Sequence, residues 1–177
     1  METIMTENER KLRYVIEKHR DTVYKVAYSY CKNSSDSDDI FQEVFLRFLK
    51  NKPNFNDEDH EKAWFIRVTI NCCKTFLASF WRIKVVELDD QISFENKEES
   101  ELFYTVLDLP KKYRIVIHLY YYEDYSIKEI SKILDIKETT IQTQLQRARE
   151  MIKKKLVEGG DELEQAFVQK SVFKSGY

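Results

Sequence analysis

The chain has 177 residues with a net charge of −2, and 42% of its residues are apolar and 34% charged. This balance is typical of a soluble globular protein, of one medium domain or two small ones. Its three glycines lie at positions 159, 160 and 176, which excludes a glycine-rich phosphate loop or a dinucleotide fingerprint. No apolar run is long enough for a membrane span and no signal-peptide core is present, so we expect a cytoplasmic protein without membrane insertion.

The first half of the chain predicts helices, because apolar residues recur at steps of three and four positions. Residues Asn33 to Ser37 predict a loop and capping cluster. Pro53 ends the helix before it, and a polar acidic loop follows over Asn54 to Asp59. The three predicted helices cover Glu7 to Cys31, Asp38 to Lys50 and His60 to Arg82.

Residues 85 to 100 differ from the rest, since they are acidic and show no helical period, which predicts a flexible linker. Helices resume over Glu101 to Leu107 and Lys111 to Tyr122. Ser126 and Glu129 then form a capping box, which begins a short helix. A turn over Asp135 to Glu138 leads into a longer helix over Thr139 to Val157, and this order predicts a helix-turn-helix.

The predicted fold class is all-α, with two small helical domains joined by a flexible acidic linker. The second is a four-helix domain that contains the helix-turn-helix. The predicted boundaries are 1–84 for the first domain, 85–100 for the linker, 101–158 for the second domain and 159–177 for a tail of unassigned role.

The last predicted helix has a buried stripe and an opposite polar face. Glutamine can pair with adenine and arginine with guanine in the major groove, and lysine can contact phosphate. A polar stripe is usually a solvated face, but the capped helix and tight turn before it favour a surface that reads duplex DNA. The predicted contacts are Thr139, Thr140, Gln142, Thr143, Gln146, Arg147 and Lys153.

The third predicted helix places Trp64 among polar residues, including Arg67, Asn71 and Lys74. An exposed tryptophan among such residues suits phosphates and unstacked bases. The pattern equally allows Trp64 to pack on a neighbouring element.

On the second predicted helix, Leu46 and Leu49 lie at the margin of the apolar face beside Gln42, Glu43 and Arg47. This arrangement indicates either a surface for a protein partner or ordinary wide core packing.

No group of side chains suits catalysis or a metal. His19, His60 and His118 lie in separate segments without a second ligand at metal spacing. Cys72 and Cys73 lie on the inward arc and are expected to be buried as small apolar residues, and three cysteines in all predict no disulfide framework. We therefore expect no enzyme, no catalytic residue, no metal and no cofactor.

Three segments, in order, resemble the extracytoplasmic-function (ECF) group of bacterial RNA polymerase sigma factors, in the sigma-70 family. Asp38 to Leu46 is similar to the family's segment that binds the polymerase clamp helices. Ala63 to Asn71, with Phe80 to Arg82, is similar to the segment that contacts the −10 promoter element. Leu109 to Arg149 is similar to the −35-binding domain.

The resemblance implies a sigma factor that binds core RNA polymerase and directs promoter-specific initiation on duplex −35 and melted −10 DNA. It makes an anti-sigma factor a further expected partner, which could hold the protein at the inner face of the membrane. The residues implied for core polymerase are Asp39, Gln42, Glu43, Leu46 and Leu49. Those implied for the −10 element are Asn54, Phe55, Asn56, Asp57, His60, Trp64, Arg67, Asn71, Lys74 and Arg82.

Several positions depart from the family's pattern. Gln142 and Gln144 stand where lysine and arginine are usual, and Asp135 stands for a glycine. With a net charge of −2, these changes predict that the chain alone binds duplex DNA weakly. One alternative is a stand-alone helix-turn-helix regulator that dimerises through its first domain. Another is a sigma-like protein that occupies polymerase without opening DNA.

Overall fold

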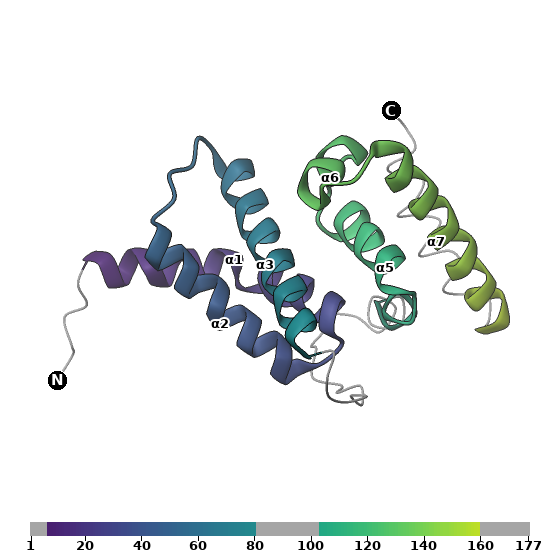
Figure 1. Cartoon of the computed structure of the whole chain (residues 1–177), viewed down its shortest axis with the longest axis horizontal. Coiled ribbons are helices and arrows are strands. Elements are labelled where there is room, and N and C mark those ends of the chain that lie inside the picture. The colour runs from purple at the N-terminus through teal and green to yellow at the C-terminus, as the bar shows by residue number, and fades with distance from the viewer. Residues whose placement is uncertain (1–6, 81–102, 160–177) are drawn as a thin grey trace. The chain divides into compact units, whose positions relative to one another are not determined.

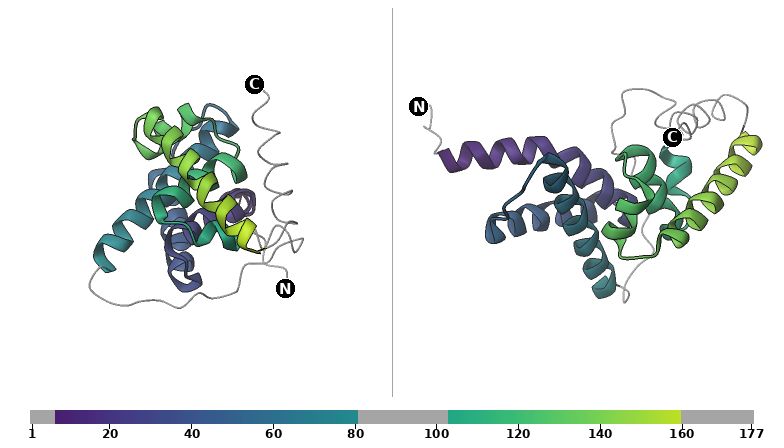
Figure 2. Two further views of the ribbon diagram at one scale, coloured as in Figure 1. Left: turned by 90° about the vertical axis from the view of Figure 1, so that its right-hand side faces the viewer. Right: turned by 90° about the horizontal axis from the view of Figure 1, so that it is seen from above.

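Residues 7 to 80 fold into three long helices in a computed structural model of the chain (Figure 1). They are α1 (Glu7–Cys31), α2 (Ser34–Asn51) and α3 (Glu58–Phe80), and each packs against the other two (Figure 2). The structure describes residues 7–80 and 103–159, which belong to two separate compact units. The predicted linker and tail lie outside the described residues.

The start of α2 differs from the prediction of a loop over Asn33 to Ser37. Only Asn33 is a cap: its Oδ1 accepts a hydrogen bond from the Asp36 amide at 2.8 Å, so the helix begins at Ser34. The preceding Lys32 has a φ of 57°, and this left-handed residue separates α1 from α2. Serine and aspartate belong here to the first helical turn, where acidic residues are favourable.

Phe65 on α3 is at the centre of the first unit and is fully buried. Its ring centroid lies 4.3 Å from that of His19 on α1, and 5.4 Å from those of Phe45 and Phe48 on α2. A phenylalanine buried in this way stabilises a fold by about 1.5–3 kcal/mol. Other core residues come from all three helices: Val23, Val26, Ala27, Ile40, Val44, Ile66 and Ile70.

The described part of the second unit, residues 103–159, contains four helical segments, as predicted. Residues 103–107 form the first, followed by α5 (Lys111–Ile117), which continues as a π-helical turn, η1 (His118–Tyr122). The sequence predicted one regular helix over Lys111 to Tyr122. In the π turn, His118 stacks on Tyr122 with ring centroids 5.4 Å apart. The buried Arg114 donates to the carbonyls of Leu107 and Leu109 at 3.0 and 2.9 Å, which satisfies the end of the first segment.

The helix-turn-helix consists of α6 (Ile127–Leu134) and α7 (Glu138–Gly159). The predicted capping box is present, with both reciprocal bonds between Ser126 and Glu129. Asp135 takes the left-handed conformation that the turn requires, with a φ of 57°. The predicted buried residues of α7 are Ile141, Leu145, Ala148 and Ile152, and all four are buried. This arrangement leaves the opposite face of α7 exposed.

Ser126→Ala should destabilise the second unit by about 1 kcal/mol, because α6 loses its cap. The serine hydroxyl accepts from the Glu129 amide at 3.3 Å and contacts Glu129 Oε2 at 2.6 Å. Urea unfolding followed by circular dichroism measures the loss. The control is Lys128→Ala, an exposed change in the same turn, which should stay within about 0.5 kcal/mol of the natural chain. Equal losses in both variants would contradict a capping role.

Candidate nucleic-acid interfaces

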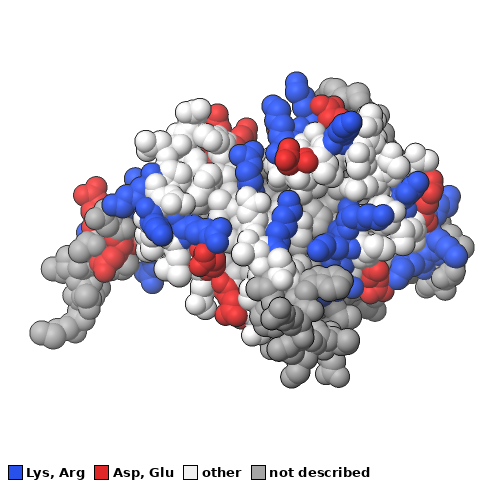
Figure 3. All heavy atoms as spheres, in the orientation of Figure 1, with Lys and Arg blue, Asp and Glu red and all other residues white. Residues whose placement is uncertain are grey.

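The outer face of α7 carries the seven residues that the sequence predicted to contact duplex DNA. All seven are exposed. Figure 3 shows basic side chains over α7 with acidic side chains between them. Near the N-terminus of α7 the predicted contacts are uncharged, namely Thr139, Thr140, Gln142 and Thr143, although Glu138 in the first turn is acidic, and the cations Arg147 and Lys153 follow. The helix can therefore offer hydrogen bonds near its N-terminus and charge further along.

Several polar side chains of α7 have partners within the unit. Gln146 Nε2 donates to Glu150 Oε1 at 3.1 Å. Arg147 hydrogen-bonds the hydroxyl of Tyr113 on α5, and this bond lowers the pKa of Tyr113. Arg149 Nε donates to the Tyr121 hydroxyl at 2.7 Å. The two arginine contacts attach α7 to α5 and η1.

Arg149 is an anchor that sequence reasoning missed. Its guanidinium carbon also lies 5.7 Å from the ring centroids of both Tyr120 and Tyr121, in the range of cation–π contacts. The run of tyrosines at 120–122 was a possible signal, and two of them, Tyr120 and Tyr121 on η1, contact Arg149. Arg149 therefore holds α7 on the unit.

The loop before α3 is built on an aromatic column. Phe55 packs edge-on against His60 and Trp64, with ring centroids 5.6 and 5.8 Å apart. Trp64 in turn contacts Phe48 on α2 at 6.1 Å. Trp64 is therefore half-buried, which favours the second of the two interpretations that the sequence left open: it packs on a neighbouring element, because the loop places Phe55 on it.

The polar tip of this loop is exposed at Asn54, Asn56 and Asp57. Asp57 Oδ1 accepts from the His60 amide at 2.7 Å, and the Asn56 amide donates to His60 Nδ1 at 3.3 Å. These bonds fix the entry into α3, so the tip is held in one conformation beside the aromatic column.

A polar stripe continues along α3 from the column. It consists of Arg67, Asn71 and Lys74, which are spaced four and three residues apart and are all exposed. None of the three side chains forms a hydrogen bond or ion pair with another residue in the described parts of the chain. Such a stripe has the donors and charge that a nucleic-acid strand requires. Arg82, also predicted for this face, lies outside the described residues.

A half-buried carboxylate ties the start of α3 to α1. Glu61 Oε2 accepts from Lys18 Nζ at 3.1 Å, and Glu61 Oε1 lies 3.0 Å from Nε2 of the buried His19. Lys18 also donates to Glu58 at 3.0 Å. Burial raises the pKa of Glu61, but bonds with His19 and Lys18 outweigh it, so the pKa lies below its usual range. Sequence reasoning missed this contact, which joins residues more than 40 positions apart.

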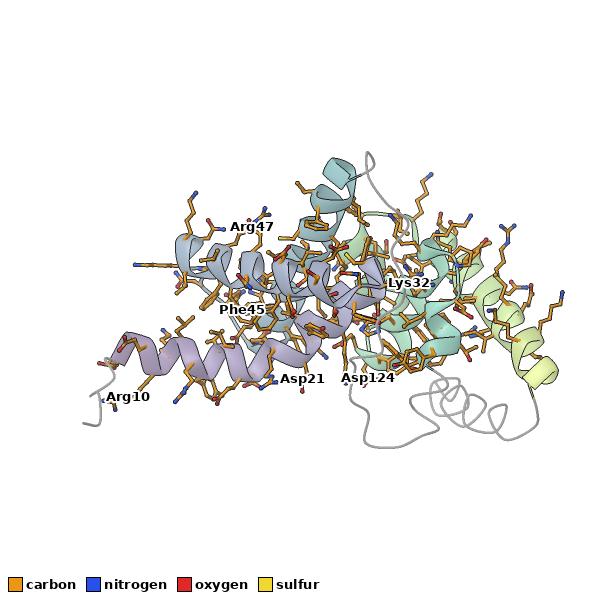
Figure 4. All side chains as sticks on the ribbon, turned by 90° about the horizontal axis from the view of Figure 1, so that it is seen from below. Arg10, Asp21, Lys32, Phe45, Arg47 and Asp124 are labelled. Atoms are coloured by element: carbon orange, nitrogen blue, oxygen red, sulfur yellow. The ribbon has the colours of Figure 1, made fainter. Side chains whose placement is uncertain are left out.

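The outer face of α2 exposes two large apolar side chains, Leu46 at 60% and Leu49 at 44%. The predicted neighbours Asp39, Gln42 and Glu43 are exposed too, and Glu43 Oε1 accepts from Arg47 Nε at 2.6 Å. Figure 4 shows Phe45 on the side of α2 toward α1 and Arg47 on the outer side. The leucines do not belong to the core, so wide core packing does not account for them.

The histidines and cysteines have structural environments. Within residues 7–80 and 103–159, no group of acidic, histidine or cysteine side chains could hold a metal ion. Cys72 and Cys73 are buried, as predicted, and a bond with Cys31 and burial raise the pKa of Cys73. In the same residues no helix has both the length and the apolar character needed to cross a membrane.

Comparison with known families assigns both units. Residues 15–83 match the family described as Sigma-70 region 2, and residues 102–152 match Sigma-70, region 4. RNA polymerase sigma factor SigZ of Bacillus subtilis is 32% identical over 133 residues, which cover 69% of this chain and 73% of SigZ. The chain belongs to the sigma-70 family of sigma factors. It is thus a sigma factor that directs promoter-specific transcription initiation. The alternative of a stand-alone helix-turn-helix regulator is not favoured.

Two further comparisons agree with this assignment. Sigma factor SigV of Bacillus subtilis is 28% identical over 141 residues, which cover 76% of this chain and 84% of SigV. The sigma factor RpoE of Bartonella quintana, solved with the anti-sigma factor NepR, has the same fold, with a TM-score of 0.62 at 15% identity. That match covers 85% of this sigma factor and 96% of RpoE. Other relatives are named ECF sigma factors, the group predicted from the sequence.

Lowering the pH from about 8 to about 5 should destabilise the first unit through His19. Burial lowers the pKa of His19 from its ordinary 6.5, although Glu61 opposes this shift. In the window below pH 6.5 the unfolded chain therefore binds a proton that the folded chain does not. Stability is full above this window and is lost as the pH falls. Urea unfolding followed by tryptophan fluorescence measures it, since the two tryptophans are residues 64 and 81.

His19→Gln should flatten this pH dependence. The exposed His60→Gln is the control and should keep it. A pH dependence that is unchanged in His19→Gln would contradict the assignment to His19.

Proposed function

We propose that this sigma factor binds core RNA polymerase through the outer face of α2. The observation that carries this proposal is the exposure of Leu46 and Leu49 beside the Glu43–Arg47 ion pair. Apolar side chains surrounded by polar ones are typical of the centre and rim of a protein interface. Asp39, Gln42 and Glu43 supply the rim on the same helix.

The loop over residues 54–60 and the polar stripe of α3 are proposed to hold the melted −10 strand. The exposed loop tip lies beside the Phe55–Trp64 column, where an unstacked base can be received. Arg67, Asn71 and Lys74 then follow the strand along α3. Because Trp64 is half-buried, its role is to support the loop and offer one edge to a base, rather than a full stacking surface.

The outer face of α7 is proposed to read the −35 element in the major groove. Helix-turn-helix proteins present the N-terminal residues of their second helix to base edges. With four neutral residues in that part of α7 and a net charge of −2, the grip on DNA depends on polymerase.

The proposal includes the domain boundaries 1–84, 85–100 and 101–158, with a tail over 159–177. It assigns the protein to the cytoplasm, where its polymerase works, and includes an anti-sigma factor as partner, able to hold the protein at the inner membrane face. No catalytic role is proposed.

Run-off transcription with purified core polymerase tests the proposal. Added protein should direct initiation at a subset of genomic promoters, whereas the protein alone should shift the same duplexes weakly in a gel. The absence of any specific transcript, or tight binding of a palindromic duplex without polymerase, would contradict it.

Leu46→Asp should weaken binding to core polymerase at least tenfold, because a carboxylate is placed at the apolar centre of the interface. Fluorescence anisotropy with labelled protein measures the dissociation constant. The matched control is Tyr14→Asp, which changes another exposed large side chain, on α1. A similar loss in both variants, or none in Leu46→Asp, argues against the α2 face.

Asn71→Ala should reduce strand opening roughly tenfold while core binding stays intact. Asn71 supplies one of several uncharged contacts that strand opening needs, and one such contact contributes about 1 kcal/mol. Permanganate reactivity of promoter thymines measures the opening. Thr75→Ala is the control, because Thr75 is exposed on the same helix and its hydroxyl donates to the Asn71 carbonyl at 3.0 Å. A promoter with a pre-melted −10 region should restore most transcription. Normal opening by Asn71→Ala would remove this residue from the site.

A further inference from the structure

We propose that Gln142 selects an adenine and Thr143 a thymine methyl group in the duplex read by α7. This inference rests on the proposed function of α7 and adds which bases two of its residues prefer.

The position of the two residues is suited to base edges. Both lie in the first turns of α7 and are exposed, whereas the adjacent Ile141 is 0% exposed and Leu145 is 1% exposed. The buried residues fix the rotation of the helix on the unit. Gln142 and Thr143 therefore face outward in a fixed direction, at the end of the helix that enters the groove first.

Gln142 differs from the other planar side chains on this face. Gln146 has its amide nitrogen bonded to Glu150, and Arg147 is bonded to Tyr113. Among residues that the structure describes, the Gln142 side chain has no such partner. Its amide keeps both a donor and an acceptor for a bidentate pair with adenine N6 and N7. Because the amide is neutral, it gains little from phosphate and most from a base edge.

Thr143 presents its methyl group rather than its hydroxyl. Thr143 Oγ1 donates to the Thr139 carbonyl at 2.9 Å, so its proton is used within the helix. The residue is nevertheless exposed, which leaves the γ-methyl accessible. The apolar partner of a threonine methyl in the major groove is the C5-methyl of thymine.

The test is transcription from a promoter library randomised across the −35 element, using core polymerase and the full chain, with transcripts counted by sequencing. The natural chain should require adenine at one position, by about 5- to 100-fold over other bases. Gln142→Arg should change the preference at that position to guanine, and Gln142→Ala should abolish it there alone. Lys132→Ala, which changes an exposed residue on α6, is the control and should leave every preference in place.

A second pair of variants tests the methyl group. Thr143→Val keeps a methyl and loses the hydroxyl, so the preference for thymine should persist. Thr143→Ser keeps the hydroxyl and loses the methyl, so that preference should disappear.

The outcomes separate this inference from the proposed function. Specific transcription with unchanged preferences in Gln142→Arg and Gln142→Ala overturns the role of Gln142 and leaves the sigma function standing. Loss of the thymine preference in Thr143→Val, with retention in Thr143→Ser, overturns the role of the methyl group. A natural chain that gives no promoter-dependent transcript overturns the proposed function and this inference with it.

Discussion

The first unit depends on the enclosure of Phe65 by aromatic rings from all three of its helices. His19 contacts it from α1, and Phe45 and Phe48 contact it from α2. The ring fixes the rotation of α3, so the polar stripe that begins at Arg67 must face outward. Trp64, next in sequence, contacts the same ring and carries the loop through Phe55. The core and the proposed −10 surface are therefore two sides of one aromatic cluster, and a change in either one alters the other.

The second unit separates packing from recognition in a different way. A stripe of aliphatic residues seats α7 on the unit, and Arg149 fastens it to the π turn through Tyr121. An arginine that holds the fold together thus lies on the same helix as residues proposed to read DNA. Helical periodicity in the sequence places both the anchoring arginine and the residues proposed to read DNA at polar positions. Only the tertiary contacts distinguish the anchor Arg149 from readers such as Gln142.

Local chemistry predicted much of the fold. The stripe over Glu7 to Cys31 and the box between Ser126 and Glu129 depend on residues a few positions apart, and both are confirmed. Features that depend on distant residues were not predictable. The sequence left open whether Trp64 is exposed or packed, because a helical wheel does not include Phe55, and Glu61 gives no sign in the sequence that it pairs with Lys18. For the candidate sites, most of the residues that the sequence selected are exposed, whereas Phe55 and Trp64 are half-buried, and the internal partners of the selected residues required the structure.

The uncharged contact residues proposed near the start of α7 bear on ionic strength. Each cation that neutralises a DNA phosphate releases condensed counterions, and each such contact adds about 0.9 to the slope of log affinity against log salt concentration. Contacts made by amide and methyl groups release no counterions. In α7 the proposed contacts near the N-terminus are threonine and glutamine, and Arg147 and Lys153 come later along the helix. Binding by the N-terminal part of α7 therefore depends only weakly on salt concentration. Under the proposed function, promoter choice by this sigma factor therefore depends less on salt concentration than the total strength of binding does.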